Sequence, residues 1–279
     1  MKYLAIDLGS SSARIMLAEK NSADINLTEI ARFPHSASLD NKGHYRWDID
    51  SLFGNIKEQV QKAIEDYKIE SIGICSWGVD YGVIGEDGRL LDMPYCYRDS
   101  RGEVAFKKLH EIISEEDLYA TSGIYPNPIN TIYQLYADKE EKRYNGKKVK
   151  IAMIADLLAY YLTGNICIER SNASTTGLLN IKGDDWNFDL INKLGIDKKI
   201  FPKIIVDGDK YGEFCGVPVV AVGTHDTASA IYALDGLDNK SAFLASGSWL
   251  LFGKVLDSPI CNKIAFDNRY TNAFSYPHL

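Results

Sequence analysis

Asp7 and the small residues 9–12, a glycine followed by three serines, form the first group in the chain that could hold a charged ligand. The apolar runs 3–8 and 13–18 on either side are predicted to be two strands joined by this turn. Backbone amides and hydroxyls in such a turn can surround one anion, and a carboxylate beside them can anchor a metal ion. The alternative is an ordinary hairpin with small turn residues.

Asp226 is the best candidate for a catalytic base. It lies between a predicted strand, 217–222, and a helix predicted to begin beside it, with His225 and Thr227 as its neighbours. Ligands of open α/β sheets bind at the carboxyl ends of strands, which is where this carboxylate is expected. The position also fits a helix N-cap, and without further context the N-cap is the stronger interpretation.

Two more polar groups could bind a substrate. Residues 75–81 place Trp77, Gly78 and Asp80 directly after a predicted strand, where a tryptophan could pack on a sugar ring while an acid bonds its hydroxyls. The alternatives are a core tryptophan, a turn glycine and a cap. Residues 97–101, which contain Arg98 and Asp99, form the other group, whose alternative is a surface salt bridge of little energetic weight.

Other common chemistries find little support in the sequence. The serine in residues 73–78 falls one position too late for a G-x-S-x-G nucleophile elbow. His225 beside Asp226 is not a triad, since adjacent side chains usually point apart and no nucleophile is identified. Neither the P-loop pattern nor G-x-G-x-x-G occurs, so neither common nucleotide fingerprint applies.

The predicted elements around these groups indicate an α/β fold. Residues 25–30 alternate as a third strand, so the chain begins with a three-stranded antiparallel meander. Asp48 is a good N-cap for a helix whose apolar residues, from Ile49 to Tyr67, recur along one face. Residues 69–75 read as a buried strand. Three strands, a helix and a strand are how a sheet with a crossover helix begins.

The rest of the chain is predicted to be mainly helical in the middle and stranded near its end. Residues 83–90 look like a hairpin with an Asp-Gly turn, and helices are expected over 104–113, 129–137 and 151–162, the last ended by Gly164. Residues 242–245 and 249–255 flank the turn Ser246-Gly247-Ser248, a pattern like that of the first turn. This weak repeat, about 240 residues after the first, suggests a second similar domain; the alternative is coincidence.

The composition of the chain limits the cellular compartment and the classes of binding partner that we expect. The chain has 279 residues, a formal charge of −7 and a pI near 5.3, which argues against general binding to nucleic acid or anionic membranes. No run approaches the roughly 18 apolar residues of a membrane span. The five cysteines are widely spaced without a C-x-x-C pair, which suits reduced thiols in a cytoplasmic protein.

Taken together, the motifs resemble the FGGY carbohydrate kinases. The resemblance rests on four segments in order, 6–14, 77–81, 97–101 and 223–230, with residues 172–176 and 184–186 as further matches to those members that act on L-rhamnulose. It covers residues 1 to about 255. The family belongs to the actin-like ATPase superfamily, so the resemblance implies two ribonuclease-H-like α/β domains with ATP and sugar between them.

The resemblance also implies roles for individual residues. Asp226 would take the proton from the primary hydroxyl of L-rhamnulose, and Asp7 would hold Mg²⁺ through water. The sugar would be lined by Gly78, His225, Asp226 and Thr227, with Asp80, Arg98 and Asp99 as neighbours. The ATP phosphates would contact Ser10, Ser11, Ser12, Ala13, Arg14 and, in the second turn, Ser248.

The sequence departs from the family near its C-terminus. Family members are much longer, and residues 270–272 enter a family motif that residues 273–279 leave. We therefore expect an N-terminal sugar-binding domain over residues 1–240 and an incomplete ATP-binding domain over 241–279. The second segment is expected to expose an apolar patch that could recruit another copy or a complementing chain. Two hypotheses follow: a kinase for L-rhamnulose or another ketose, impaired by truncation, or a non-catalytic sugar-binding remnant or half-enzyme.

Overall fold

The computed structural model describes residues 1–22, 24–234, 236–247 and 250–272. Its strands are β1 (Lys2–Leu8), β2 (Ser12–Lys20), β3 (Ile25–Pro34), β4 (Ala37–Leu39), β5 (Tyr45–Trp47), β6 (Ile69–Ser76), β7 (Tyr81–Gly85), β8 (Val149–Met153), β9 (Ile168–Glu169), β10 (Ile204–Ile205), β11 (Lys210–Phe214), β12 (Val217–Val220), β13 (Ala242–Ser246) and β14 (Leu250–Lys254). Its helices are α1 (Ile49–Asp66), α2 (Arg101–Leu109), α3 (Glu115–Ser122), α4 (Thr131–Glu140), α5 (Ile154–Thr163), α6 (Arg170–Ser174), α7 (Phe188–Lys193), α8 (Asp226–Tyr232) and α9 (Lys263–Asp267), with a 3₁₀ turn at Lys198–Ile200.

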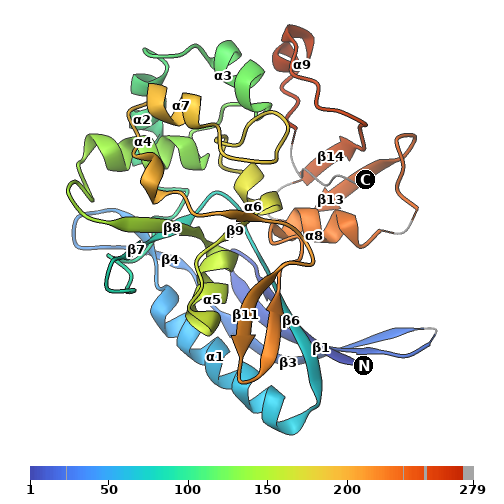
Figure 1. The fold of residues 1–279 in the computed structure, drawn as a ribbon. Helices are drawn as coiled ribbons and strands as arrows, with labels where there is room; N and C mark the ends of the chain where they lie inside the picture. The colour runs from blue at the N-terminus through green and yellow to red at the C-terminus, as the bar shows by residue number, and fades with distance from the viewer. Residues whose placement is uncertain (23, 235, 248–249, 273–279) are drawn as a thin grey trace.

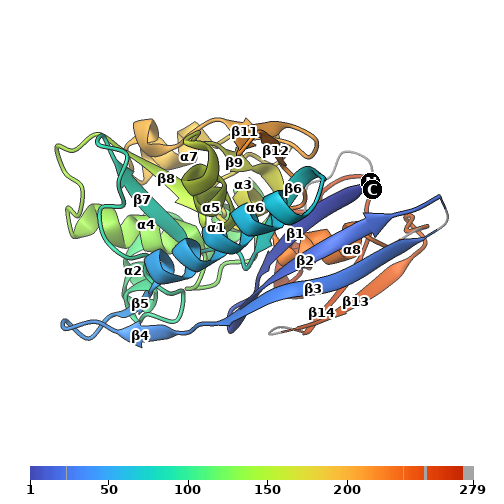
Figure 2. The ribbon, with the colours of Figure 1, turned by 90° about the horizontal axis from the view of Figure 1, so that it is seen from below.

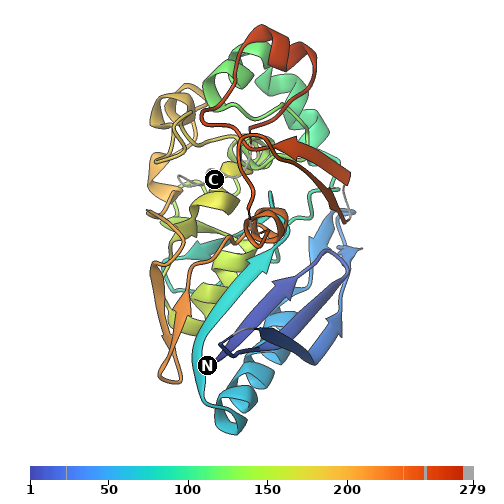
Figure 3. The same cartoon turned by 90° about the vertical axis from the view of Figure 1, so that its right-hand side faces the viewer.

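The central element is a six-stranded sheet in the order β11-β12-β6-β1-β2-β3. The predicted meander is confirmed, because β1, β2 and β3 are antiparallel neighbours. Strands β6 and β12 then add parallel to β1, so three strands end at the same edge. Figure 3 shows the fan of strands, with the β11–β12 hairpin at one side and β3 at the other.

Helices α1 and α5 cover one face of this sheet (Figures 1 and 2). The predicted N-cap of α1 is confirmed: the carboxylate of Asp48 accepts a hydrogen bond from the Ser51 amide at 3.4 Å. The predicted end of α5 is confirmed as well, since Gly164 is left-handed at φ 77°. The apolar side of α1 packs into one core with β1, β6 and α5.

A second core lies beside the first, around the β7–β8 pair and helices α2, α4 and α7. Here one prediction is wrong, because residues 151–153 belong to β8 rather than to the following helix. The predicted hairpin over residues 83–90 is confirmed in a short form: Gly88 is left-handed at φ 78°, Ile84 bridges Leu90, and the amide of Gly85 donates to the carbonyl of Arg89 at 2.8 Å. Strand β7 also pairs with β8, which the sequence did not predict.

The hairpin β13–β14 exposes one apolar face. Leu244 pairs with Phe252 and Ser246 with Leu250, which places these residues on the same side of the ribbon. Their apolar members are largely accessible to solvent, at 64% for Leu244, 70% for Leu250 and 80% for Phe252. The opposite face packs toward α8. The expected exposed apolar patch in residues 241–279 is therefore observed.

Two further expectations concern cysteines and membranes. The five cysteines are all free thiols. Within the described ranges, no helix combines the length and apolar character required to cross a bilayer.

Candidate active site

The three parallel strands bring the distant motifs to one edge of the sheet. Strand β6 lies between β1 and β12, so its last residue meets both neighbours. The amide of Ser76 donates to the carbonyl of Thr224 at 2.8 Å, and the amide of Trp77 donates to that of Leu8 at 3.1 Å. The segment after each strand therefore begins at the same place, as expected for a ligand site in an α/β sheet.

Residues 9–14, called here the phosphate turn, form a closed loop. The amide of Gly9 donates to the carbonyl of Ser12 at 3.1 Å. His35 holds the loop from outside, because its backbone amide donates to the carbonyl of Ser11 at 3.1 Å and its Nε2 donates to that of Gly9 at 2.7 Å. Sequence reasoning did not identify His35, which reaches the turn from the end of β3.

The side chains of the phosphate turn differ in what they can offer a ligand. The Ser12 hydroxyl accepts from Arg32 at 3.4 Å, and Ala13 is fully buried, so its methyl group belongs to the core. Ser11 is exposed at the tip. Arg14 lies across the β1–β2 ladder from Asp7, and the two side chains form an ion pair. The expected phosphate ligand and the expected metal ligand thus contact each other.

Asp7 and Asp226 approach the same point from β1 and α8. The charge of Asp7 contributes to raising the pKa of Asp226, although burial is the larger cause. Cys75 lies near both carboxylates: its thiol donates to Asp7 at 3.7 Å, and burial, followed by the charges of Asp7 and Asp226, raises its pKa well above normal. Both carboxylates remain partly accessible, at 28% and 36% side-chain exposure.

Asp7 could contribute one ligand to a magnesium ion whose other ligands come from water and a bound substrate. Among the residues that the structure describes, no cluster of three or more acidic, histidine or cysteine side chains could hold a metal alone. Mg²⁺ usually takes only one or two carboxylates and completes its shell with water and substrate phosphates. Asp7, beside the phosphate turn, can serve in that way.

The N-cap interpretation of Asp226 is wrong. His225 is the N-cap of α8, and Asp226 is the first helical residue. The Oδ1 atom of Asp226 accepts from the amide of Thr227 at 2.6 Å and from its hydroxyl at 3.1 Å. These bonds orient the carboxylate, and they oppose the effect of burial on its pKa.

Gly78 and His225 are in close contact across the site. A Cβ atom on Gly78 would lie 2.8 Å from Cγ2 of Thr175 and 3.2 Å from Cδ2 of His225, so a side chain at this position would displace its neighbours. Burial lowers the pKa of His225 to about 4, which keeps the imidazole neutral at pH 7. The predicted sugar residues Gly78, His225, Asp226 and Thr227 are therefore assembled in one place.

Trp77 is a core residue, as its alternative interpretation held. It is 6% exposed and packs on Trp47 with ring centroids 4.6 Å apart, and the ring of His35 contacts both tryptophans, at 5.5 Å from Trp77 and 5.6 Å from Trp47. Asp80 is fully buried beneath this pair. Its Oδ2 accepts from the indole N–H of Trp47 at 2.7 Å and of Trp77 at 3.0 Å, and its Oδ1 from Gln134 at 3.1 Å.

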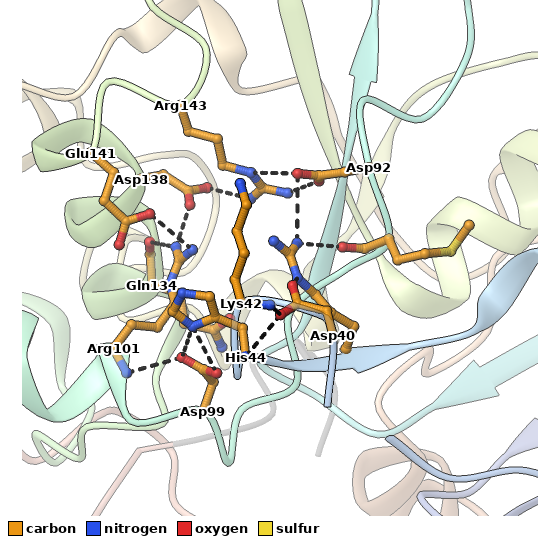
Figure 4. Close-up of polar contacts among 12 residues, drawn as sticks. Asp40, Lys42, His44, Asp92, Asp99, Arg101, Gln134, Asp138, Glu141 and Arg143 are labelled. Carbon is orange, nitrogen blue, oxygen red and sulfur yellow. Dashed lines mark hydrogen bonds and ion pairs between the residues drawn. The ribbon is translucent and has the colours of Figure 1, made fainter. Parts of the chain in front are cut away.

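Residues 97–101 do not form the surface salt bridge proposed as their alternative. Arg101 is buried and pairs with Asp138, to which Arg143 also donates at 2.9 Å (Figure 4). The predicted sugar neighbour Asp99 accepts from His44 at 3.2 Å and from the Arg101 amide at 3.0 Å. Its role here is to join the β4–β5 hairpin to α2.

The structure says little about the expected ligand contacts of Arg98 and Ser248. The guanidinium of Arg98 lies 5.2 Å from the ring of its neighbour Tyr97. Ser248, the expected second phosphate contact, lies outside the described residues.

Comparison with known proteins identifies the family. Residues 2–242 match the N-terminal domain of the FGGY family of carbohydrate kinases. The chain belongs to this family. Over 281 residues it is 37% identical to the rhamnulokinase of Lactiplantibacillus plantarum, a match covering 97% of this chain and 57% of that protein. The rhamnulokinase of Bacillus subtilis is 36% identical, with coverage of 98% and 58%.

Solved structures share the fold. The ligand-bound xylulose kinase of Lactobacillus acidophilus superimposes with a TM-score of 0.79 at 19% identity, over 93% of this chain and 55% of that one. The glycerol kinase of Plasmodium falciparum with ADP gives 0.74 at 18% identity, over 89% and 53%. The expected α/β, actin-like ATPase fold is confirmed. The chain spans little more than half the length of these relatives.

Proposed function

We propose that this chain supplies the sugar-binding side of an ATP-dependent ketose kinase, which converts L-rhamnulose to L-rhamnulose 1-phosphate. One observation carries the proposal: the carboxylates of Asp7 and Asp226, the phosphate turn and the Gly78–His225 contact meet at the carboxyl ends of β1, β6 and β12. Transfer of a phosphoryl group requires this combination of phosphate, metal and base positions.

Asp226 is proposed as the general base. It accepts the proton of the O1 hydroxyl as that oxygen bonds to the γ-phosphorus of ATP and the bond to ADP breaks. Burial raises the pKa of Asp226, and a carboxylate with a raised pKa is a stronger base than an ordinary aspartate. The bonds from Thr227 keep one carboxylate oxygen oriented.

Gly78, His225 and Thr227 are proposed to line the sugar. Because Gly78 has no side chain, the segment after β6 can pack closely against Thr175 and the imidazole of His225. Because His225 is neutral, it presents an uncharged face to a neutral sugar. Asp80 is proposed to act indirectly, because it accepts hydrogen bonds from Trp47 and Trp77 and so holds in place the tryptophan that precedes Gly78.

The phosphate turn is proposed to bind ATP through Ser10, Ser11, Ser12, Ala13 and Arg14, with Ser248 as a contact from the second turn. Asp7 would hold Mg²⁺ through water, and the ion would neutralise charge on the transferred group. In the structure Arg14 and Asp7 form an ion pair with each other. When Mg²⁺–ATP binds, the phosphates would replace Asp7 as the partner of Arg14, and Mg²⁺ would replace Arg14 as the partner of Asp7.

The choice of L-rhamnulose is supported by the relatives named rhamnulokinase; another ketose is the alternative substrate. We further propose that residues 1–240 form the sugar-binding domain, and that residues 241–279 begin the ATP-binding domain. The exposed face of β13–β14 would then contact the remainder of that domain, in this or another polypeptide. The free cysteines support a cytoplasmic location.

A coupled assay for ADP, with L-rhamnulose, ATP and Mg²⁺, tests the proposal. We expect sugar-dependent turnover that falls by about 10²–10⁴-fold in Asp226→Asn, the range for loss of a general base. Asp189→Asn is the matched control, because Asp189 lies in the first turn of α7, away from the site, and should leave turnover unchanged. Sugar binding without turnover would indicate a binding module instead, and equal turnover in both variants would exclude Asp226 as the base.

A further inference from the structure

Residues 169–176, which contain α6, contact the backbone of both sugar motifs. The hydroxyl of Thr175 accepts from the amide of Val79 at 3.0 Å, directly after Gly78. On the other side, Asn172 Nδ2 donates to the carbonyl of Thr224 at 3.5 Å. The sequence singled out residues 172–176 without giving them a task, and the structure places them between the segments that follow β6 and β12.

The carboxylate of Glu169 is the centre of these contacts. It is 1% exposed and accepts hydrogen bonds on both oxygens. Oε1 accepts from the amide of Ser171 at 2.9 Å, and Oε2 accepts from the amide and hydroxyl of Thr224 at 3.0 and 2.8 Å, and from the hydroxyl of Ser171. Burial raises the pKa of the Glu169 carboxyl, and the hydrogen bonds from Ser171 and Thr224 oppose that effect because they stabilise the ionised form.

The same carboxylate reaches the next residue through Ser171, whose hydroxyl oxygen accepts from the amide of His225 at 3.1 Å. Two successive amides before Asp226 are therefore tied to Glu169, one directly and one through a serine. They lie after the last residue of β12 and before the first residue of α8, so the regular hydrogen bonds of neither element hold them.

We propose that Glu169 is a positioning residue that fixes the Thr224–His225 backbone and so places Asp226 at the phosphoryl-transfer site. The inference rests on the proposed function only for the role of Asp226; the anchoring itself is a property of the fold. A carboxylate is required because each of the four converging groups donates. An amide at this position would turn one acceptor into a donor facing other donors.

Glu169→Gln tests the anchoring by hydrogen–deuterium exchange of the peptide spanning residues 222–228, without any substrate. Asp138→Asn is the matched control: Asp138 is also a fully buried carboxylate with several donors, but it lies in the second core, bonded to Tyr81 and the two arginines of Figure 4. We expect exchange at least 10-fold faster in Glu169→Gln than in Asp138→Asn. Equal exchange in the two variants would overturn the proposal.

Ser171→Ala keeps the test decisive if Glu169→Gln does not fold. It leaves the bonds between Glu169 and Thr224 in place and removes the bridge to His225. We expect faster exchange at the His225 amide alone, measured by NMR, and an unchanged His225 amide would contradict the anchoring.

Kinetics of the same variants test the positioning of Asp226. We expect the kcat of Glu169→Gln to fall by at least 10-fold with an unchanged KM for ATP, whereas Asp138→Asn keeps the wild-type kcat. Faster exchange with wild-type kcat would refute the positioning role. A wild-type chain without turnover would count against the proposed function, and the exchange result would still decide whether Glu169 anchors this segment.

Discussion

Asp80→Asn is expected to remove a large pH dependence from the stability of the fold. The carboxylate of Asp80 is fully buried and accepts from Trp47, Trp77 and Gln134. Burial raises its pKa from the ordinary 3.8 to about 6, against the opposing effect of these three donors. The charged form is therefore costly in the folded protein even though it is hydrogen-bonded.

The size and sign follow from this shift. The folded protein binds the Asp80 proton more tightly than the unfolded chain does, so the contribution to stability is complete below pH 3.8 and is lost as the pH rises through 6. Each pKa unit corresponds to 1.36 kcal/mol, which makes the loss about 3 kcal/mol. The amide side chain of the Asp80→Asn variant cannot titrate, so the variant lacks this loss.

Urea unfolding of the wild type and Asp80→Asn at several pH values between 4 and 7 measures the effect. We expect the free energy of unfolding of the wild type, relative to the variant, to fall by about 3 kcal/mol across this range. His225 acts in the opposite sense: its lowered pKa of about 4 gives stability that is lost as the pH falls below 6.5. It is present in both proteins and cancels in the difference. A difference that stays flat with pH would refute the account of Asp80.

Two predictions concern the contacts inside the site. Gly78→Ala places a methyl group 2.8 Å from Cγ2 of Thr175, so we expect a loss of about 1–3 kcal/mol in stability and weaker sugar binding by calorimetry. Adding Thr175→Ser removes that carbon and should partly restore both stability and sugar binding. No recovery in the double variant would contradict the steric explanation. Asp7→Asn removes a charge that raises the pKa of Asp226, so a ¹³C NMR titration of the Asp226 carboxyl should show a lower pKa than in the wild type. An unchanged or higher value would mean that the two carboxylates do not interact.

The local elements could be predicted from the sequence, because their signals are local. The Asp48 cap, the spacing of apolar residues along α1, the opening meander and the Gly164 helix end each depend on a few neighbouring residues. The boundary between β8 and α5 could not, since residues 151–155, which span it, are all apolar. The end of β8 is set by its pairing with β7, and this pairing joins segments that are far apart in the sequence.

Some residues of the candidate site could likewise be predicted from the sequence, and others could not. Asp7, Gly78 and Asp226 could be proposed because each follows or ends a recognisable strand. Trp47 and Glu169 could not: Trp47 bonds to an aspartate 33 residues away, and Glu169 to a threonine 55 residues away. The only sequence signal for Glu169 is its place beside the distinctive run 172–176.

The central claim is that the segments following β1, β6 and β12 direct phosphoryl transfer to the sugar, with Asp226 as base. ³¹P NMR of the wild type with L-rhamnulose, ATP and Mg²⁺ tests it most directly. We predict a new phosphomonoester resonance coupled to the protons on C1, formed about 10²–10⁴-fold more slowly by Asp226→Asn. No sugar phosphate from the wild type, or formation at the wild-type rate by Asp226→Asn, would contradict the account.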